Sequence, residues 1–458
     1  MNLMAKATLD MTQGSPLPLL LRFALPTLAG NLLHQVYTLT DSVIVGRYLG
    51  EIPLGAVGCT TPIIMLLAAL MIGVNIAVGI LIGQSYGCKD EHGIRRAFIS
   101  SLYLGGIIAA IMAVTGAAAS ELLLRWMGTP EGALVDAAAY LRINFMTTVC
   151  PLLYYLFSSV FRGMGDSRTA LYCLIVSVVA NVGLDVLFVA VWDWGVAGSA
   201  WATALAQGLS ALFAAILLWK RFPTLRPRAE ELMPDLKQLR HITGLAVPIA
   251  LQTAFNNIGN VVAQRAVNGF GEAVMAAYTA AGRLGTLSLM PVETIGSAMS
   301  VYTGQNYGAN KPERIRQGVQ AGLLLTAIVS TVLGAVLLFG SNWLTTLFLK
   351  KPSIQVLVVA RRYLLIAAVP GILAGVMHVF QQTLRGVDKP NHAMVGGLMQ
   401  LGVKIAVIAW GAWLLKNLDI VWLAWPLSFV AGTVWPAWVY YKHFAVLSKD
   451  ESDLSSTP

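Results

Sequence analysis

Long apolar stretches recur along the whole chain, and they restrict what this sequence can fold into. Each is eighteen or more residues long, enough to cross about 30 Å of hydrocarbon as an α-helix. Only 12% of the 458 residues are charged, whereas roughly 25% are charged in a soluble domain. No stretch alternates polar and apolar residues as the strands of a membrane barrel do. The sequence therefore predicts an all-α membrane protein.

We expect twelve transmembrane helices, at roughly residues 17–46, 54–83, 94–120, 137–161, 168–191, 195–219, 241–266, 274–304, 314–340, 356–384, 391–415 and 419–442. Most Lys and Arg residues lie at the termini and in alternate breaks between these spans, which predicts cytoplasmic termini in the plasma (inner) membrane. The same distribution accounts for the net charge of +9, so we expect no nucleic-acid partner. The first sixteen residues lack a signal-peptide pattern, and we expect no cleavable leader.

The two halves of the chain repeat each other. "GQSYGCKDEHGIRRA" (83–97) aligns with "GQNYGANKPERIRQG" (304–318) with six identities in fifteen positions. Pro26 in the first span similarly matches Pro248 in the seventh. Copies with an even number of spans enter the membrane in the same direction, and substrate sites of such carriers lie between the copies. We therefore expect two pseudo-symmetric six-helix lobes at 1–219 and 241–442, a cytoplasmic linker at 220–240 and a cytoplasmic tail at 443–458.

Polar side chains in three spans of the first half lie at one depth. Asp185 precedes the outer end of its span by seven residues and Asp41 does so by about seven, or ~10 Å at the α-helical rise. Thr203 lies eight residues inside the next span, or ~12 Å from the same face. Asn181 and Tyr37 precede the two aspartates by four residues, so each shares a helical face with its aspartate. The spacing predicts one polar cluster of these five residues.

Two chemical roles suit this cluster. Carboxylate, amide and hydroxyl oxygens are ligands for a hard cation such as Na⁺. Alternatively the cluster can hold a proton, because carboxyl groups bind protons more tightly when they are desolvated and close to a like charge. A third possibility is a structural hydrogen-bond cluster between helices. Insertion of an acid into a membrane costs at least ~2.5 kcal/mol, which favours a functional site. The four cysteines are scattered and predict no metal centre.

Several segments together resemble the multidrug and toxic compound extrusion (MATE) family. They are "ALPTLAGNLLHQVYTLTDSVIVGRYLG" (24–50), "GQSYG" with its copy "GQNYG", "FRGMGDSRTALY" (161–172) and "GVAGSAWATALAQ" (195–207). The resemblance implies twelve helices in two lobes and the export of organic, often cationic or amphipathic, compounds driven by H⁺ or Na⁺ entry. It is strongest to members with coupling carboxylates in the N-terminal lobe. It implies coupling roles for four residues of the cluster, which are Asp41, Asn181, Asp185 and Thr203.

The second half departs from another branch of that family, whose coupling acids lie in spans seven and ten. Here span seven has no acid but offers Gln252, Asn256, Asn257 and Asn260, and span ten has only His378. Glu293 lies within span eight. It is expected either to bind a cationic drug, with Asn256 and Asn257 as further candidates for substrate binding, or to pair with Lys404 or Arg283.

We therefore expect a monomeric antiporter that works by alternating access, with Pro26 as a hinge because proline removes a helical hydrogen bond. Its partners are small organic substrates and membrane lipids, with H⁺ or Na⁺ as coupling ion, no cofactor, and no metal beyond that possible Na⁺. The main alternative is a flippase for a lipid or lipid-linked precursor of the same superfamily. An intramembrane enzyme would need a second acidic motif, a Ser/His pair or HExxH, and the sequence offers none. The two-lobe repeat argues against a channel.

Overall fold

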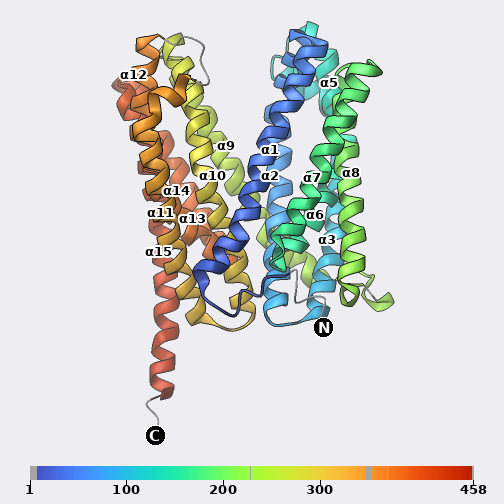
Figure 1. The fold of residues 1–458 in the computed structure, drawn as a ribbon, viewed down its shortest axis with the longest axis vertical. Helices are drawn as coiled ribbons and strands as arrows, with labels where there is room; N and C mark the ends of the chain where they lie inside the picture. The colour runs from blue at the N-terminus through green and yellow to red at the C-terminus, as the bar shows by residue number, and fades with distance from the viewer. Residues whose placement is uncertain (1–7, 227, 347–352, 369, 456–458) are drawn as a thin grey trace. The chain divides into compact units, whose positions relative to one another are not determined.

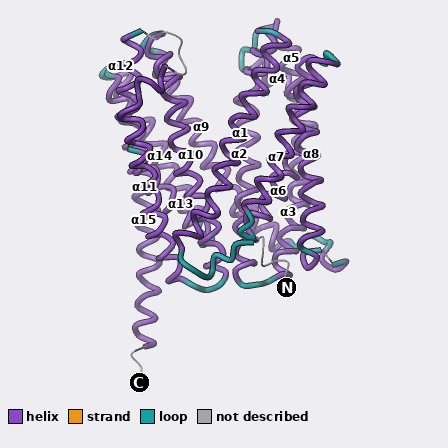
Figure 2. The backbone as a smooth tube through the Cα atoms, in the orientation of Figure 1, coloured by secondary structure: helices purple, strands orange, loops and turns teal. Residues whose placement is uncertain are grey.

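The structure, a computed structural model, describes residues 8–226, 228–346, 353–368 and 370–455. Within these ranges the chain is helical apart from turns and short loops, and no strand occurs (Figure 1, Figure 2). The α-helices are α1 (Pro16–Leu49), α2 (Glu51–Gly87), α3 (Glu91–Ile111), α4 (Ala117–Trp126), α5 (Glu131–Met146), α6 (Val149–Gly163), α7 (Ser167–Asp185), α8 (Gly195–Arg221), α9 (Leu236–Asn268), α10 (Glu272–Gly308), α11 (Pro312–Thr346), α12 (Ile354–Tyr363), α13 (Gly371–Gly386), α14 (Pro390–Ala409) and α15 (Leu418–Ser455).

Length and composition mark most of these helices as membrane spans. In the described part of the chain, eight spans are long and apolar enough: α1, α2, α3 with α4, α7, α8, α11, α14 and α15. Two helix pairs, α5 with α6 and α12 with α13, each qualify as one span bent by more than 40°. The helices α9 and α10 are 33 and 37 residues long, and they carry the polar residues that the sequence places in spans seven and eight. With α9 and α10, which do not meet the same criterion of hydropathy, the described helices cover the twelve ranges predicted as spans.

The chain forms two compact units, each with its own apolar core. Unit 1 contains residues up to Asp10 and from Leu25 to Ala250, and unit 2 contains Met11–Ala24 and the chain from Leu251 onward. The chain therefore passes from one unit to the other inside α1, next to Pro26, and inside α9, two residues after Pro248. This division follows contacts, and the six-helix lobes at 1–219 and 241–442 stay a prediction. The predicted tail at 443–458 is a continuation of α15 as far as Ser455, and residues 456–458 lie outside the described part.

The internal repeat extends to the backbone conformation. Residues with positive φ end or connect helices at matching places in the two halves, with offsets of 221 or 223 residues. The pairs are Lys89 with Asn310, Gly50 with Gly271, Gly165 with Asp388, and Asp193 with Lys416. Because a residue other than glycine adopts this conformation at a cost, such positions recur only where a turn requires them. The two halves thus share their turns as well as their motifs.

Helix starts in the two halves use different chemistry at equivalent places. In the first half, the Asp90 and Asp166 side chains accept hydrogen bonds from the backbone N–H groups of Gly93 and Thr169 and so cap α3 and α7. In the second half, α11 and α14 begin with a proline instead. Both devices suit a helix N-terminus, where the first N–H groups have no partner within the helix.

The segment between α8 and α9, predicted as a linker, packs against α3. The Glu231 side chain is only 5% exposed. Its carboxylate accepts hydrogen bonds from Arg95 Nε at 2.7 Å and from the backbone N–H of Arg228 at 2.9 Å. His92 Nδ1 lies 2.5 Å from the other carboxylate oxygen. The segment is therefore held to unit 1 by a buried ion pair.

Candidate functional site

Three helices of unit 1 bring the predicted coupling residues together. Tyr37 belongs to α1, Asn181 to α7 and Thr203 to α8. The Tyr37 hydroxyl and Thr203 Oγ1 are 3.2 Å apart and share a hydrogen bond. Asn181 Nδ2 donates a hydrogen bond to the same Thr203 oxygen at 3.3 Å. The Thr203 hydroxyl is thus the point at which the three helices meet.

The two acids of the cluster lie side by side. Asp41 of α1 and Asp185 of α7 are adjacent, and their carboxyl groups interact directly. Asp41 Oδ1 also accepts a hydrogen bond of 2.8 Å from Ser199 Oγ on α8. Sequence reasoning missed Ser199, although it precedes Thr203 by four residues and therefore lies on the same face of α8. Tyr140 of α5, also missed, lies close enough to interact with both carboxyl groups.

Two members of the cluster are buried, the other three are half-buried, and their oxygens are not all satisfied. Asp185 is 0% exposed and Asn181 is 1% exposed. Both carboxyl oxygens of Asp185 and the amide oxygen of Asn181 have no hydrogen-bond donor. Buried polar atoms almost always have a partner, so three free acceptors beside a second carboxyl group suit a bound cation or proton. The helix α7 ends at Asp185 and continues as a π-helical turn over Val186–Val191 (η3), a deformation often found at functional sites.

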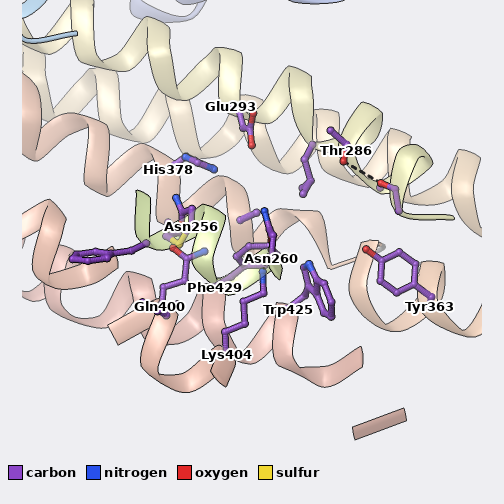
Figure 3. Close-up of a pocket in the computed structure, with 18 residues that line it drawn as sticks. Asn256, Asn260, Thr286, Glu293, Tyr363, His378, Gln400, Lys404, Trp425 and Phe429 are labelled. Atoms are coloured by element: carbon purple, nitrogen blue, oxygen red, sulfur yellow. Dashed lines mark hydrogen bonds between the residues drawn. The ribbon is translucent and has the colours of Figure 1, made fainter. Parts of the chain in front are cut away.

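Unit 2 contains a cavity of about 240 Å³, shown in Figure 3. Glu293 of α10 and Asn256 of α9, two of the three predicted substrate-binding residues, line it. The third, Asn257, is not among the lining residues. His378 of α13, Gln400 of α14 and several aromatic side chains complete the walls.

Glu293 forms neither of the ion pairs considered from the sequence. Lys404 Nζ instead donates a hydrogen bond to Asn260 Oδ1 at 2.7 Å and lies 4.8 Å from the centre of the Trp425 ring. Arg283 lines a separate hollow with residues of α9 and α10, among them Gln264 and Asn268. Among the residues that the structure describes, Glu293 has no ion-pair partner. The cavity therefore presents an acid and a base that do not neutralise each other directly.

A model of the MatE family matches the chain twice, at residues 26–187 and at residues 248–410. The second match begins 222 residues after the first, which agrees with the offset of the repeated motifs. The matches include Asp41, Asn181 and Asp185 in the first segment and Glu293 and Lys404 in the second.

Curated relatives are similar over most of their length. The chain is 30% identical to the probable multidrug resistance protein YoeA of Bacillus subtilis, and the 420 aligned residues cover 90% of each protein. It is 24% identical to the FAD transporter of Shewanella oneidensis, over 83% of this chain and 85% of that protein. It is 22% identical to the multidrug export protein MepA of Staphylococcus haemolyticus, over 85% of each.

Solved structures share the fold. One, described as MATE in the bent conformation, superimposes with a TM-score of 0.89 at 21% identity and covers 99% of both chains. A transporter of the MOP superfamily from Pyrococcus furiosus superimposes with a TM-score of 0.88 at 21% identity, over 96% of this chain and 98% of that one. These likenesses confirm the predicted fold class, an all-α membrane protein of twelve transmembrane helices in two pseudo-symmetric lobes.

Proposed function

The chain belongs to the MatE family of membrane transporters, and on this premise we propose that it is a secondary active antiporter that exports organic compounds in exchange for H⁺ or Na⁺. It is a multi-pass membrane protein and a transporter rather than an enzyme. We place it in the plasma (inner) membrane as a monomer with both termini cytoplasmic and without a cofactor. Its transported partners are small organic molecules, often cationic or amphipathic.

The proposed coupling site is the cluster around Asp41 and Asp185. The observation that carries the proposal is that these acids, from helices far apart along the chain, lie close together, and that Asp185 is fully buried with no hydrogen-bond donor to its oxygens among the described residues. An incoming cation or proton supplies the missing partner and removes the repulsion between two carboxylates. Neutralising a buried charge changes the relative stability of helix arrangements, because an unpaired charge is costly in a medium of low polarity.

Pro26 is the proposed hinge of this response. It lies inside α1, eleven residues before Tyr37 and beside the point at which α1 passes between the units. A proline within a helix removes a backbone hydrogen bond, so the helix bends there more easily than elsewhere. When the cluster binds its ion, α1 repacks, the affinity for the organic compound falls, and the compound leaves on the outer side. The ion is released inside when the lobes rock back.

The substrate is proposed to bind in the unit 2 cavity. Glu293 supplies a negative charge for a cationic group, and Asn256 supplies an amide on a neighbouring wall. Asn257 does not line this cavity, so it is proposed only as a contact in another state of the transport cycle.

Proteoliposomes that contain the protein test the proposal. Dye efflux is measured with a proton gradient or a sodium gradient imposed separately, and the gradient that drives efflux identifies the coupling ion.

We expect Asp41→Asn to abolish gradient-driven efflux while the protein stays folded, because the amide cannot exchange a proton and binds a cation poorly. Asp193→Asn is the matched control: Asp193 lies in an exposed turn with positive φ, which asparagine tolerates. Efflux by Asp41→Asn at the wild-type rate would refute the coupling role. Gradient-independent movement of labelled lipids without dye efflux would favour the flippase.

A further inference from the structure

The unit 2 cavity holds two opposite charges that are not paired with each other. Glu293 enters it from α10 and Lys404 enters it from α14 (Figure 3). The Lys404 ammonium group instead contacts the Asn260 amide oxygen and the face of Trp425. A direct ion pair would leave the cavity nearly neutral. Here one wall carries an acid and another carries a base.

Lys404 is only 8% exposed, and no acid among the described residues pairs with it. A buried ammonium group without an acid partner is costly, and the cost falls when an anion reaches it. Its hydrogen bond and the cation–π contact compensate for only part of the lost hydration. Because the Asn260 amide oxygen accepts from Lys404, the amide nitrogen of Asn260 is left as a second donor nearby. These two groups suit a carboxylate or a similar acidic group of a ligand.

Gln400 offers the ligand a hydrogen-bond acceptor, whereas Lys404 and Asn260 offer donors. It precedes Lys404 by four residues on α14 and so lines the same cavity. Gln400 is 8% exposed, and its amide oxygen has no hydrogen-bond donor. This oxygen suits an N–H group of a ligand, and the Glu293 carboxylate on another wall suits a cationic group. The unmet acceptor is a second sign, independent of the two charges, that the cavity is built for a ligand.

Aromatic side chains form much of the remaining wall, and they are Phe255, Tyr363, Trp425 and Phe429. Such surfaces bind a flat ring well, and a few polar groups among them fix its direction. The cavity of about 240 Å³ accommodates a small ring system rather than a large lipid-linked sugar.

We propose that this cavity recognises aromatic zwitterions, with the cationic end of the ligand at Glu293 and the acidic end at Lys404 and Asn260. The inference rests on the proposed function in taking the cavity as a substrate site. It narrows the substrate class, because a site for simple organic cations needs no buried lysine. Lys404 then acts as a specificity residue, since it favours ligands that bring an anionic group.

Equilibrium binding to the purified protein tests this inference with three matched probes. The zwitterion is 4′-(aminomethyl)biphenyl-4-carboxylic acid, the cation is its methyl ester, and the anion is 4′-methylbiphenyl-4-carboxylic acid. We expect wild-type protein to bind the zwitterion at least ~10-fold more tightly than either of the other two, because each charged contact in a desolvated site contributes strongly. Calorimetry in detergent without an ion gradient measures this preference, so the result does not depend on whether antiport occurs.

Variants assign the preference to Lys404. We expect Lys404→Gln to lower zwitterion affinity to that of the ester and to change ester affinity less than ~2-fold, whereas Lys404→Arg keeps the preference because it keeps the charge. Lys416→Gln, a lysine in an exposed turn near the end of the same transmembrane span, serves as the matched control and should match the wild type. Equal affinity of wild-type protein for zwitterion and ester, binding of none of the probes, or an equal loss in the control overturns the proposal. If Lys404→Gln fails to fold, the wild-type series alone decides.

Discussion

At the scale of single residues, the Thr203 hydroxyl is the hydrogen-bond centre of the unit 1 cluster. It joins Tyr37 of α1 to Asn181 of α7. Thr203→Val keeps the shape of the side chain and removes both hydrogen bonds, each worth about 1 kcal/mol. We expect the initial rate of gradient-driven efflux to fall roughly 30-fold at subsaturating ion concentration, since two such bonds amount to about 2 kcal/mol.

The control for this prediction is Thr38→Val. The Thr38 hydroxyl is exposed and donates only to the His34 carbonyl of its own helix, at 3.0 Å. Its loss should leave efflux unchanged. An equal effect of both variants would mean that Thr203 has only a general role in helix packing.

Lys404 illustrates a conflict between stability and function at one residue. Replacing a buried charge with an apolar side chain of similar length removes the penalty of burying that charge, which is on the order of several kcal/mol. We therefore expect Lys404→Met to raise the melting temperature of the ligand-free protein in detergent, while Lys416→Met, in an exposed turn, leaves it unchanged. A lower melting temperature for Lys404→Met would show that the contacts with Asn260 and Trp425 outweigh the cost of burying the ammonium group.

Single residues also show what the sequence could predict. Helical spacing places Asp185 with Asn181, and the depth argument selects Asp41 as their neighbour. The same spacing does not say which way α9 faces: successive residues differ by about 100° around a helix, and Asn256 lines the cavity whereas Asn257 does not. The bond from Lys404 to Asn260 depends on how two distant helices pack, so no local pattern could reveal it.

At the scale of elements, a buried ion pair holds the segment between α8 and α9 against α3. The hydrogen bond from Arg95, with further bonds from Arg228 and His92, lowers the pKa of Glu231 from its ordinary value of 4.5 to about 2. A carboxyl group whose pKa is lower in the folded state stabilises that state fully above its unfolded pKa. The contribution of Glu231 is therefore complete above about pH 4.5 and is lost as the pH falls toward 2.

We expect Glu231→Gln to release this segment at neutral pH, because buried Arg95 then loses its close carboxylate partner at 2.7 Å and keeps Glu91 at 3.9 Å. Breaking a buried ion pair costs roughly 3–5 kcal/mol, so trypsin should cut the segment at least ~10-fold faster than in the wild type. Glu230→Gln, at the exposed neighbouring position, is the control.

In wild-type protein, hydrogen exchange of residues 223–235, corrected for intrinsic rates, should increase as the pH falls from 5 to 3. Equal protection in Glu231→Gln and the wild type would show that apolar packing alone holds the segment.

At the scale of the whole molecule, the repeat has produced two halves that share turns but differ in chemistry. Lys89 and Asn310 end equivalent helices with the same backbone conformation. The first half has two adjacent acids that lack full compensation, whereas the second half has an acid and a base around a cavity. The proposed antiporter thus separates its two tasks, with ion binding in one unit and substrate binding in the other.

This division of tasks makes a quantitative prediction. If ion binding at Asp41 and Asp185 weakens ligand binding in the unit 2 cavity by some factor, the ligand must weaken ion binding by the same factor, because the coupling free energy is reciprocal. Couplings of this kind are typically about 5–150-fold. We expect the dissociation constant of the biphenyl zwitterion to rise by a factor in this range when the coupling ion saturates, and the ion's dissociation constant to rise equally when the zwitterion saturates. Calorimetric titrations in both orders measure the two factors.

In Asp185→Asn, the factor by which the ion changes the ligand's dissociation constant should be close to one. The ligand should still bind, since the cavity itself is unchanged. A ligand affinity in wild-type protein that does not respond to the ion would show that the two sites are not coupled, and the antiport proposal would then be wrong even if both sites bind.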